Sequence, residues 1–128
     1  MKMFMRKYDK AIPTKFWSFL ICDRYFTAWD NLDIDEDLAC VHEDYDITFH
    51  TTGRVMRLKE LSSQTGSMMV LAKFDNRRLI YDNEDILVTH GITKFGDGHR
   101  KAVLQSTLKK DGLLRRAETG TTPFLSKD

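Results

Sequence analysis

The pattern of hydrophobic and polar positions changes along the chain. In the first part, apolar residues recur three or four positions apart, as they do on one face of a helix. The members of this stripe are Phe19, Cys22, Phe26 and Trp29. Because Pro13 suits the entry of a helix, we expect this helix to run from about Thr14 to Asn31. Further apolar residues around it indicate that it is covered on two sides.

Shorter segments follow the first helix. A second helix is predicted from apolar residues spaced i, i+4, i+7 and i+11, which are Ile34, Leu38, Val41 and Tyr45. Carboxylates at positions 35–37 fall in its first turn and oppose the helix dipole, so we interpret them as capping residues. Residues 46–50 alternate as a short strand and 51–53 form a turn. Residues 56–65 read as a helix, and 66–75 fit either a buried helix or a strand.

The second part of the chain has the alternation of strands. The predicted strands are residues 78–81, 86–94, 100–109 and 113–121. The predicted turns between them are residues 82–85, 96–98 and 110–112. Helices followed by strands in meander order predict an α+β domain, with helices packed on one face of a curved antiparallel sheet and room for one pocket.

Length and charge narrow the range of partners. With 128 residues, of which 41% are hydrophobic and 30% charged, the chain forms one domain with a single core. We expect an extension over 1–12, a core over 13–123 and a tail over 124–128. Twenty basic and nineteen acidic residues leave a net charge of +1. This balance favours neither nucleic acid nor an anionic membrane as a partner.

Cysteine usage and the amino terminus point to the cytoplasm. Cys22 and Cys40 lack any metal-ligand spacing, so two buried free thiols are expected, which suits a reducing compartment. Charged residues interrupt the first ten positions, which excludes a signal-peptide core, and no segment has the ~20 apolar residues of a membrane span. The acidic series that ends at Asp37 imitates a calcium loop, but Leu38 occupies the glycine position. No metal and no cofactor are expected.

Two motifs carry a resemblance to a known family. A long helix ending in Arg24-Tyr-Phe-Thr-Ala-Trp-Asp-Asn-Leu-Asp33 precedes Asp44-Tyr-Asp-Ile-Thr-Phe-His-Thr-Thr-Gly53 and a closing meander. Over residues 13–123 this order resembles the nuclear transport factor 2-like superfamily, whose SnoaL-like polyketide cyclases and ketosteroid isomerases are the nearest enzymes. The resemblance implies a cone-shaped sheet with three helices of the N-terminal half on its concave face, a cystatin-like α+β barrel. It also implies a small apolar ligand at the mouth of the cone and a homodimer formed through the sheet.

The resemblance also suggests catalytic residues. The isomerase tyrosine that donates to the developing oxyanion stands in a motif similar to Arg24-Tyr25-Phe26, so Tyr25 is a candidate donor, with a buried core tyrosine as the alternative. Counting back from Gly53 places His50 at the position of the isomerase general base, and a register shifted by one residue selects Phe49 instead. A histidine with a pKa near 6.5 can move a proton at neutral pH.

Other positions complete the expected pocket. The second isomerase oxyanion donor aligns with Leu104, which cannot donate a hydrogen bond, so ketosteroid isomerisation itself is disfavoured. His90 is the best unassigned neighbour for His50, with a satisfied core histidine as the alternative. We expect Phe26, Trp29, His90 and Leu104 to line the ligand site.

Three functions remain open from the sequence. The first is a cofactor-independent isomerase, cyclase or hydrolase that transfers a proton on an apolar carbonyl or polyketide-like compound, with His50 as base and Tyr25 as donor. The second is a pocket that binds a small molecule without catalysis. The third is a dimeric interaction module in which the pocket is filled core.

Overall fold

The computed structural model describes residues 14–123 of the chain, and the side chains from residue 20 onward. The expected extension 1–12 and tail 124–128 lie outside the described residues. The elements, in chain order, are α1 (Thr14–Asp30), α2 (Ile34–Ala39), β1 (Val41–Phe49), β2 (Arg54–Arg57), α3 (Leu58–Leu71), β3 (Ala72–Asp82), β4 (Ile86–Phe95), β5 (Arg100–Lys110) and β6 (Leu113–Pro123). None of the described helices is long and apolar enough to cross a membrane.

Helix α1 has the bounds that its apolar pattern predicts. Its last turn is closed by Leu32, whose φ of 53° lets the amide of Asp33 bond to the carbonyl of Ala28 at 2.8 Å. The expected stripe is buried at Cys22 and Trp29, while the side chain of Phe19 lies outside the described residues. The helix therefore presents its C-terminal half to the interior.

The second predicted helix is wrong beyond its first turns. Helix α2 ends at Ala39, and the chain continues as strand β1 from Val41. Val41 and Tyr45 are buried, but on the strand. A spacing of four residues keeps two side chains on one face of a helix and on one face of a strand, so this pattern could not separate the two. Asp33 caps α2 by accepting a 3.2 Å hydrogen bond from the amide of Glu36.

The six strands form one curved sheet in the order β2-β1-β6-β5-β4-β3. The long meander β4-β5-β6 and its turns confirm the sequence prediction, and glycines with positive φ occupy the turns at Gly98 and Gly112. The sheet is mixed, because β1 pairs with β6 in parallel, whereas a wholly antiparallel sheet was expected. Strand β2 was not predicted. The segment 66–75, which the sequence left open between helix and strand, divides into the end of α3 at Leu71 and the start of β3 at Ala72.

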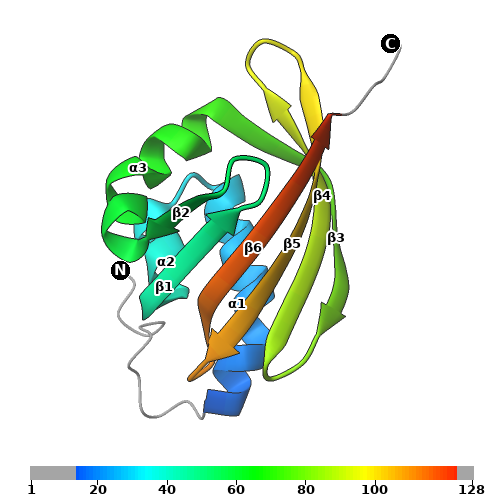
Figure 1. Ribbon diagram of the computed structural model, residues 1–128. Helices are drawn as coiled ribbons and strands as arrows, with labels where there is room; N and C mark the ends of the chain where they lie inside the picture. Colours follow the sequence, from blue (N-terminus) through cyan, green and yellow to red (C-terminus); the bar gives the residue numbers. More distant parts are fainter. Residues whose placement is uncertain (1–13, 124–128) are drawn as a thin grey trace.

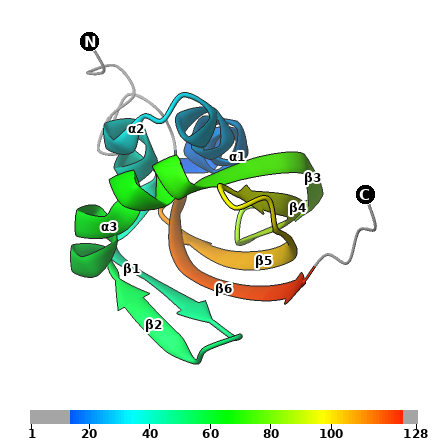
Figure 2. The same ribbon diagram turned by 90° about the horizontal axis from the view of Figure 1, so that it is seen from above.

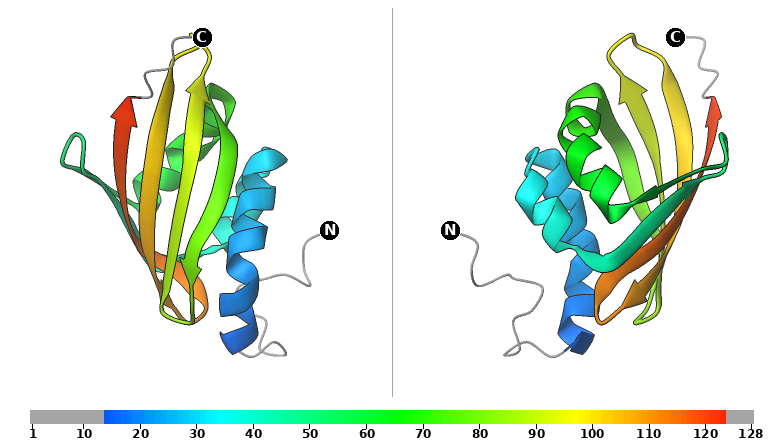
Figure 3. Two further views of the ribbon diagram at one scale, coloured as in Figure 1. Left: turned by 90° about the vertical axis from the view of Figure 1, so that its right-hand side faces the viewer. Right: turned by 60° about the vertical axis from the view of Figure 1, so that its left-hand side comes forward.

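The sheet and the helices enclose one interior. Helices α1, α2 and α3 lie along the concave side of the sheet (Figures 1 and 2). The convex side of β3–β6 has no helix in front of it (Figure 3, left). One inward row, in which Ile47 pairs with Ala117, Ala117 with Thr107 and Thr107 with Leu87, is buried throughout. This row is a continuous buried layer of the core, and Ile47 within it also lines the cavity.

Candidate functional site

A cavity of about 510 Å³ lies between the concave face of the sheet and the three helices. This volume is in the range of small-molecule sites. On β1 the alternate residues Tyr45, Ile47 and Phe49 face it. The strand register continues the wall, because Phe49 pairs with Thr119 and Thr119 with Gln105. Most of this wall is apolar, so its polar groups are few and specifically placed.

The deep end of the cavity holds a buried acid. Asp37 on α2 is 2% exposed, and its Oδ1 accepts a 3.0 Å hydrogen bond from Nε1 of Trp29 on α1. Burial raises the pKa of the Asp37 carboxyl to about 6, against the smaller opposing effect of the Trp29 hydrogen bond. A carboxyl with this pKa changes its protonation close to neutral pH, where it can act as an acid or a base.

Two tyrosines share the cavity with this acid. Burial raises the pKa of Tyr25 well above its ordinary value, the negative charge of Asp37 adds to that effect, and a hydrogen bond from the Gln105 side chain opposes it. Burial also raises the pKa of Tyr45, again with a contribution from Asp37. Both hydroxyls therefore keep their protons at neutral pH and can serve as hydrogen-bond donors. The cavity combines an ionisable acid with neutral donors.

Aromatic rings hold the Tyr25–Trp29 face of α1 against the sheet. The ring centroids of Tyr25 and Trp29 are 6.4 Å apart, and Trp29 meets Phe74 of β3 edge-on at 5.1 Å. All three line the cavity. Because the indole is fixed on both sides, its N–H is held in the direction of Asp37.

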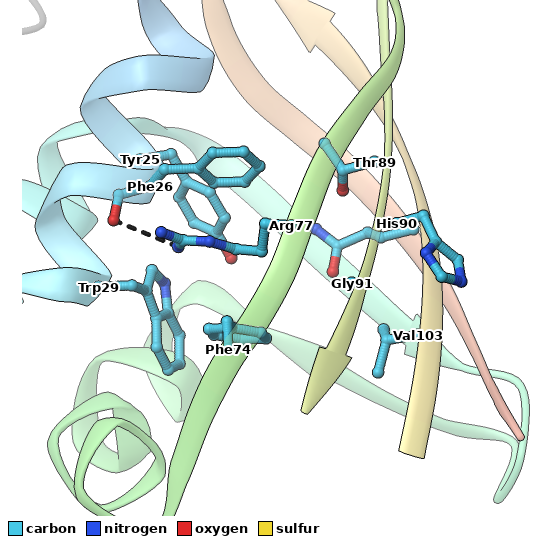
Figure 4. Close-up of a pocket in the computed structure, with 10 residues that line it drawn as sticks. Tyr25, Phe26, Trp29, Phe74, Arg77, Thr89, His90, Gly91 and Val103 are labelled. Carbon is cyan, nitrogen blue, oxygen red and sulfur yellow. Dashed lines mark hydrogen bonds between the residues drawn. The ribbon is translucent and has the colours of Figure 1, made fainter. Parts of the chain in front are cut away.

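Arg77 closes a smaller side pocket of about 40 Å³ next to the main cavity. The pairing of β3 with β4 shifts at this point, and Asn76 has a φ of 51°, as in a bulge. The bulge turns Arg77 toward α1, where its guanidinium lies 4.3 Å from the centroid of Phe26 and donates to the Phe26 carbonyl at 3.3 Å (Figure 4). A second guanidinium nitrogen lies 2.6 Å from Asp30. Gly91 leaves room for this side chain, because a Cβ there would stand 3.1 Å from Cγ of Arg77.

No protein-family model and no curated protein sequence matches the chain. Solved structures do resemble it. A nuclear transport factor 2-like protein of unknown function from Burkholderia xenovorans superposes with a TM-score of 0.74 at 11% identity, covering 88% of both chains. A steroid delta-isomerase from Pseudomonas aeruginosa has a TM-score of 0.65 at 10% identity, covering 84% of this chain and 81% of its own. An epoxide hydrolase from Mycobacterium tuberculosis has a TM-score of 0.65 at 12% identity, covering 86% of both.

The chain has the nuclear transport factor 2-like fold. The expected site residues can therefore be located in that fold. Tyr25 and Trp29 line the main cavity, and Phe26 lines the side pocket beneath Arg77. These three side chains lie on one face of α1 (Figure 4).

His50 does not line the main cavity, so the expectation of a general base at this residue is corrected. His50 follows the last residue of β1, its side chain is 57% exposed, and its Nε2 lies 2.9 Å from Oε1 of Glu118. The neighbours Phe49 and Thr51 line the cavity instead. Successive side chains of an extended segment point to opposite faces, so the alternative register, which selects Phe49, describes the cavity wall.

His90 and Leu104 are also misplaced by the sequence interpretation. They pair with each other across β4 and β5, and their neighbours Gly91 and Val103 form the adjacent pair. Leu104 is 51% exposed, and the imidazole of His90 points away from Tyr25 (Figure 4). Only His90 touches the side pocket, and neither residue lines the main cavity. Both side chains belong to the convex face of the nuclear transport factor 2-like sheet.

The sequence interpretation missed Asp37, Tyr45 and Gln105 as cavity residues. Asp37 was interpreted as a capping carboxylate, yet it is buried. The sequence held no signal that separates Asp37 from exposed neighbours such as Asp35. Within the part of the chain that the structure describes, no group of three His, Cys, Asp or Glu side chains could hold a metal ion.

Proposed function

We propose that the chain binds a small, mostly apolar molecule in the cone and transfers a proton on it, as an isomerase or cyclase acting on a carbonyl or polyketide-like compound. The observation that carries the proposal is the buried carboxyl of Asp37 at the deep end of an apolar cavity of about 510 Å³. A steroid delta-isomerase and an epoxide hydrolase share the fold, which supports chemistry on small molecules.

Asp37 is the proposed proton acceptor and donor. Its Oδ1 is held by Trp29, and no described residue donates a hydrogen bond to Oδ2, which leaves that oxygen for the ligand. With its pKa at about 6, the carboxyl is ionised at pH 7 yet binds a proton more tightly than an ordinary aspartate. A buried acid also destabilises the fold, and such a cost is typical of functional sites.

Tyr25 is the proposed donor to the carbonyl oxygen. Its neutral hydroxyl lies in a site that excludes most water, where a hydrogen bond to a developing oxyanion stabilises the transition state. Proton abstraction by Asp37 beside that carbonyl would place negative charge on the oxygen that Tyr25 contacts. No cofactor is needed for this step, since the proton moves between the carboxylate and the ligand carbon.

The proposal is tested first by binding. Purified protein is screened by thermal shift against cyclic ketones, steroids and polyketide fragments, because a ligand of the native state raises its stability. Val103→Trp, which fills the cavity from β5, is expected to abolish the shift. Val70→Trp on the exposed face of α3 is the matched control. If Val103→Trp does not fold, Thr121→Trp at the mouth replaces it. A shift that survives a folded cavity-filling variant contradicts binding in the cone.

Catalysis is tested on a ligand found in this way. Exchange of the protons next to its carbonyl with deuterium is followed by NMR. Asp37→Asn is expected to stop the exchange while binding persists, and Tyr25→Phe to slow it by roughly 10²-fold or more. Binding without exchange in the unchanged protein contradicts the enzyme and supports the second candidate, a non-catalytic binding protein, which the mostly apolar wall also favours.

We further propose a homodimer through the convex face of the sheet. Tyr81, Leu104 and Leu108 are 54%, 51% and 47% exposed there. Val88 pairs with Tyr81, and His90 with Leu104, so these apolar groups are neighbours on β3, β4 and β5. Burial of such a surface against a second copy would stabilise both. A cytoplasmic location is proposed from the two buried free thiols.

A further inference from the structure

The charged residues of the cavity are separated by depth. Among the described residues that line it, Asp37 is the acid and Arg54 and Lys101 are the bases. Asp37 is buried, Lys101 is half-buried and Arg54 is exposed. Arg54 begins β2 after the β1–β2 turn, and Lys101 is the second residue of β5 after the β4–β5 hairpin. Lys101 therefore lies at the hairpin end of β5, whereas the strand register places Arg54 level with Gln105, through Phe49 and Thr119.

Strand geometry gives the length of the cavity between these groups. Lys101 and Gln105 lie four residues apart on the same inward face of β5. At about 3.3 Å per residue, this separation is roughly 13 Å. Gln105 and Tyr25 line the same two pockets, so Gln105 marks the level of the proposed carbonyl donor. A ligand that reaches from Lys101 to Tyr25 must be extended by about this distance.

The ammonium group of Lys101 has an apolar setting. Its Nζ lies 5.8 Å from the ring centroid of Phe95, and that ring stacks on His99 at 4.6 Å. No carboxylate among the described residues is within ion-pair distance of Lys101. Arg54 has a weak ion pair with Glu60, 3.6 Å apart with both side chains about half exposed. An anion that reaches Lys101 would therefore meet no competing carboxylate among the described residues.

We propose that Lys101, with the hydroxyl of Thr93, binds an anionic end of the ligand, which is thus an extended apolar carboxylate. This inference rests on the proposed function and names its ligand class. Thr93 is directly opposite Lys101 on β4 and lines the cavity. The charge of Asp37 repels an anion from the deep end, so the carboxylate stays at the mouth and the apolar body extends inward.

The test compares two probes of the same chain length, one charged and one neutral. Dodecanoate and methyl dodecanoate are titrated below their aggregation limits, and Kd is measured by calorimetry or by displacement of a cavity dye. We expect the acid to bind more tightly than the ester in the unchanged protein. Added salt should weaken the binding of dodecanoate and leave the binding of its ester unchanged. Hexanoate is too short to fill the length of the cavity and should bind more weakly than dodecanoate.

Lys101→Met removes the charge and keeps the length of the side chain. The Kd of dodecanoate should rise about tenfold or more, because a hydrogen bond to a charged group is lost. The Kd of the ester should change by less than about twofold. Lys94→Met is the matched control, since Lys94 is one residue from Thr93 on β4, is exposed and does not line the cavity.

The outcomes separate this inference from the proposed function. Equal binding of acid and ester in the unchanged protein, or equal losses in Lys101→Met and Lys94→Met, overturns the anion site and leaves the apolar cavity standing. If neither dodecanoate nor its ester binds, and no carbonyl compound gives a thermal shift, both the anion site and the proposed function are contradicted. A preference for the acid that Lys101→Met alone removes supports the carboxylate ligand.

Discussion

The indole N–H of Trp29 donates a 3.0 Å hydrogen bond to Asp37 across the junction of α1 and α2, and both side chains are buried. A hydrogen bond from a neutral donor stabilises the carboxylate only in part. Burial is the larger effect and raises the pKa of Asp37 from 3.8 to about 6. The pair therefore keeps an acid inside the cone at a cost to folding that depends on pH.

The first prediction is that Asp37→Asn stabilises the protein in a pH-dependent way. Between about pH 4 and pH 6 the folded chain retains a proton that the unfolded chain releases, so the stability of the unchanged protein falls as pH rises through about 6. A shift of this size corresponds to about 3 kcal/mol. We expect the free energy of unfolding in urea to be higher for Asp37→Asn than for the unchanged protein by up to this amount at pH 8. At pH 4 the two free energies should be nearly equal.

The control for this prediction lies on the same helix. Asp35 is exposed, so Asp35→Asn should change the free energy of unfolding by less than about 1 kcal/mol at either pH. If Asp37→Asn is no more stable at pH 8 than the unchanged protein, Asp37 does not carry a buried charge and the proposed acid is wrong.

The second prediction concerns the indole. Trp29→Phe leaves the Asp37 carboxylate without its donor, which should cost about 1–3 kcal/mol at pH 8 in addition to lost packing. The loss should shrink at pH 4, where the acid is neutral. A double-mutant cycle with Asp37→Leu, which removes the acceptor at similar size, is measured by urea unfolding and isolates the pair from the packing against Phe74. Additive effects at pH 8 would show that the hydrogen bond contributes nothing.

The third prediction concerns the two thiols. Burial raises the pKa of Cys22 to about 11 and that of Cys40 to about 12, so neither is a thiolate at pH 8. Reaction with a disulfide reagent should therefore be slow in buffer and should release two equivalents promptly in denaturant. A thiol that reacts within seconds in the native protein would mean that α1 or the α2–β1 junction opens readily.

The fourth prediction tests the convex face. Leu104→Glu puts a charge at the centre of the proposed dimer surface and should convert a dimer into a monomer in light scattering coupled to gel filtration. Val70→Glu, on the exposed face of α3, should leave the mass unchanged. A monomer before substitution, or a dimer that survives Leu104→Glu, contradicts this interface.

Much of the fold follows from periodicity, and the errors have a physical cause. Helix α1 and the strands β4 to β6 are long, so several repeats separate the helical period from that of a strand. Helix α2 has six residues, and Val41 and Tyr45 fit either period. Strand β2 has four residues and too few repeats to stand out. Pairing of β1 with β6 in parallel depends on long-range contacts that no local pattern encodes.

The site was less predictable because it depends on which side of each strand faces inward. Tyr25 and Trp29 were found because the helical stripe marks the face that α1 buries. His50 and Leu104 were selected by counting from a glycine, and an error of one residue moves a side chain to the opposite face of the sheet. Asp37 was hidden among neighbouring carboxylates that do lie at the surface, such as Asp35.

The central claim is that the cone contains an acid that titrates near neutral pH. The most direct measurement is the pH titration of the Asp37 carboxyl carbon by NMR, with protein labelled at aspartate and the signal assigned by Asp37→Asn. The account predicts a midpoint near pH 6, about two pH units above the ordinary value of an aspartate, and a higher midpoint in Trp29→Phe. A midpoint near 4 would contradict it, because Asp37 would then be a solvated carboxylate with no special capacity to transfer a proton.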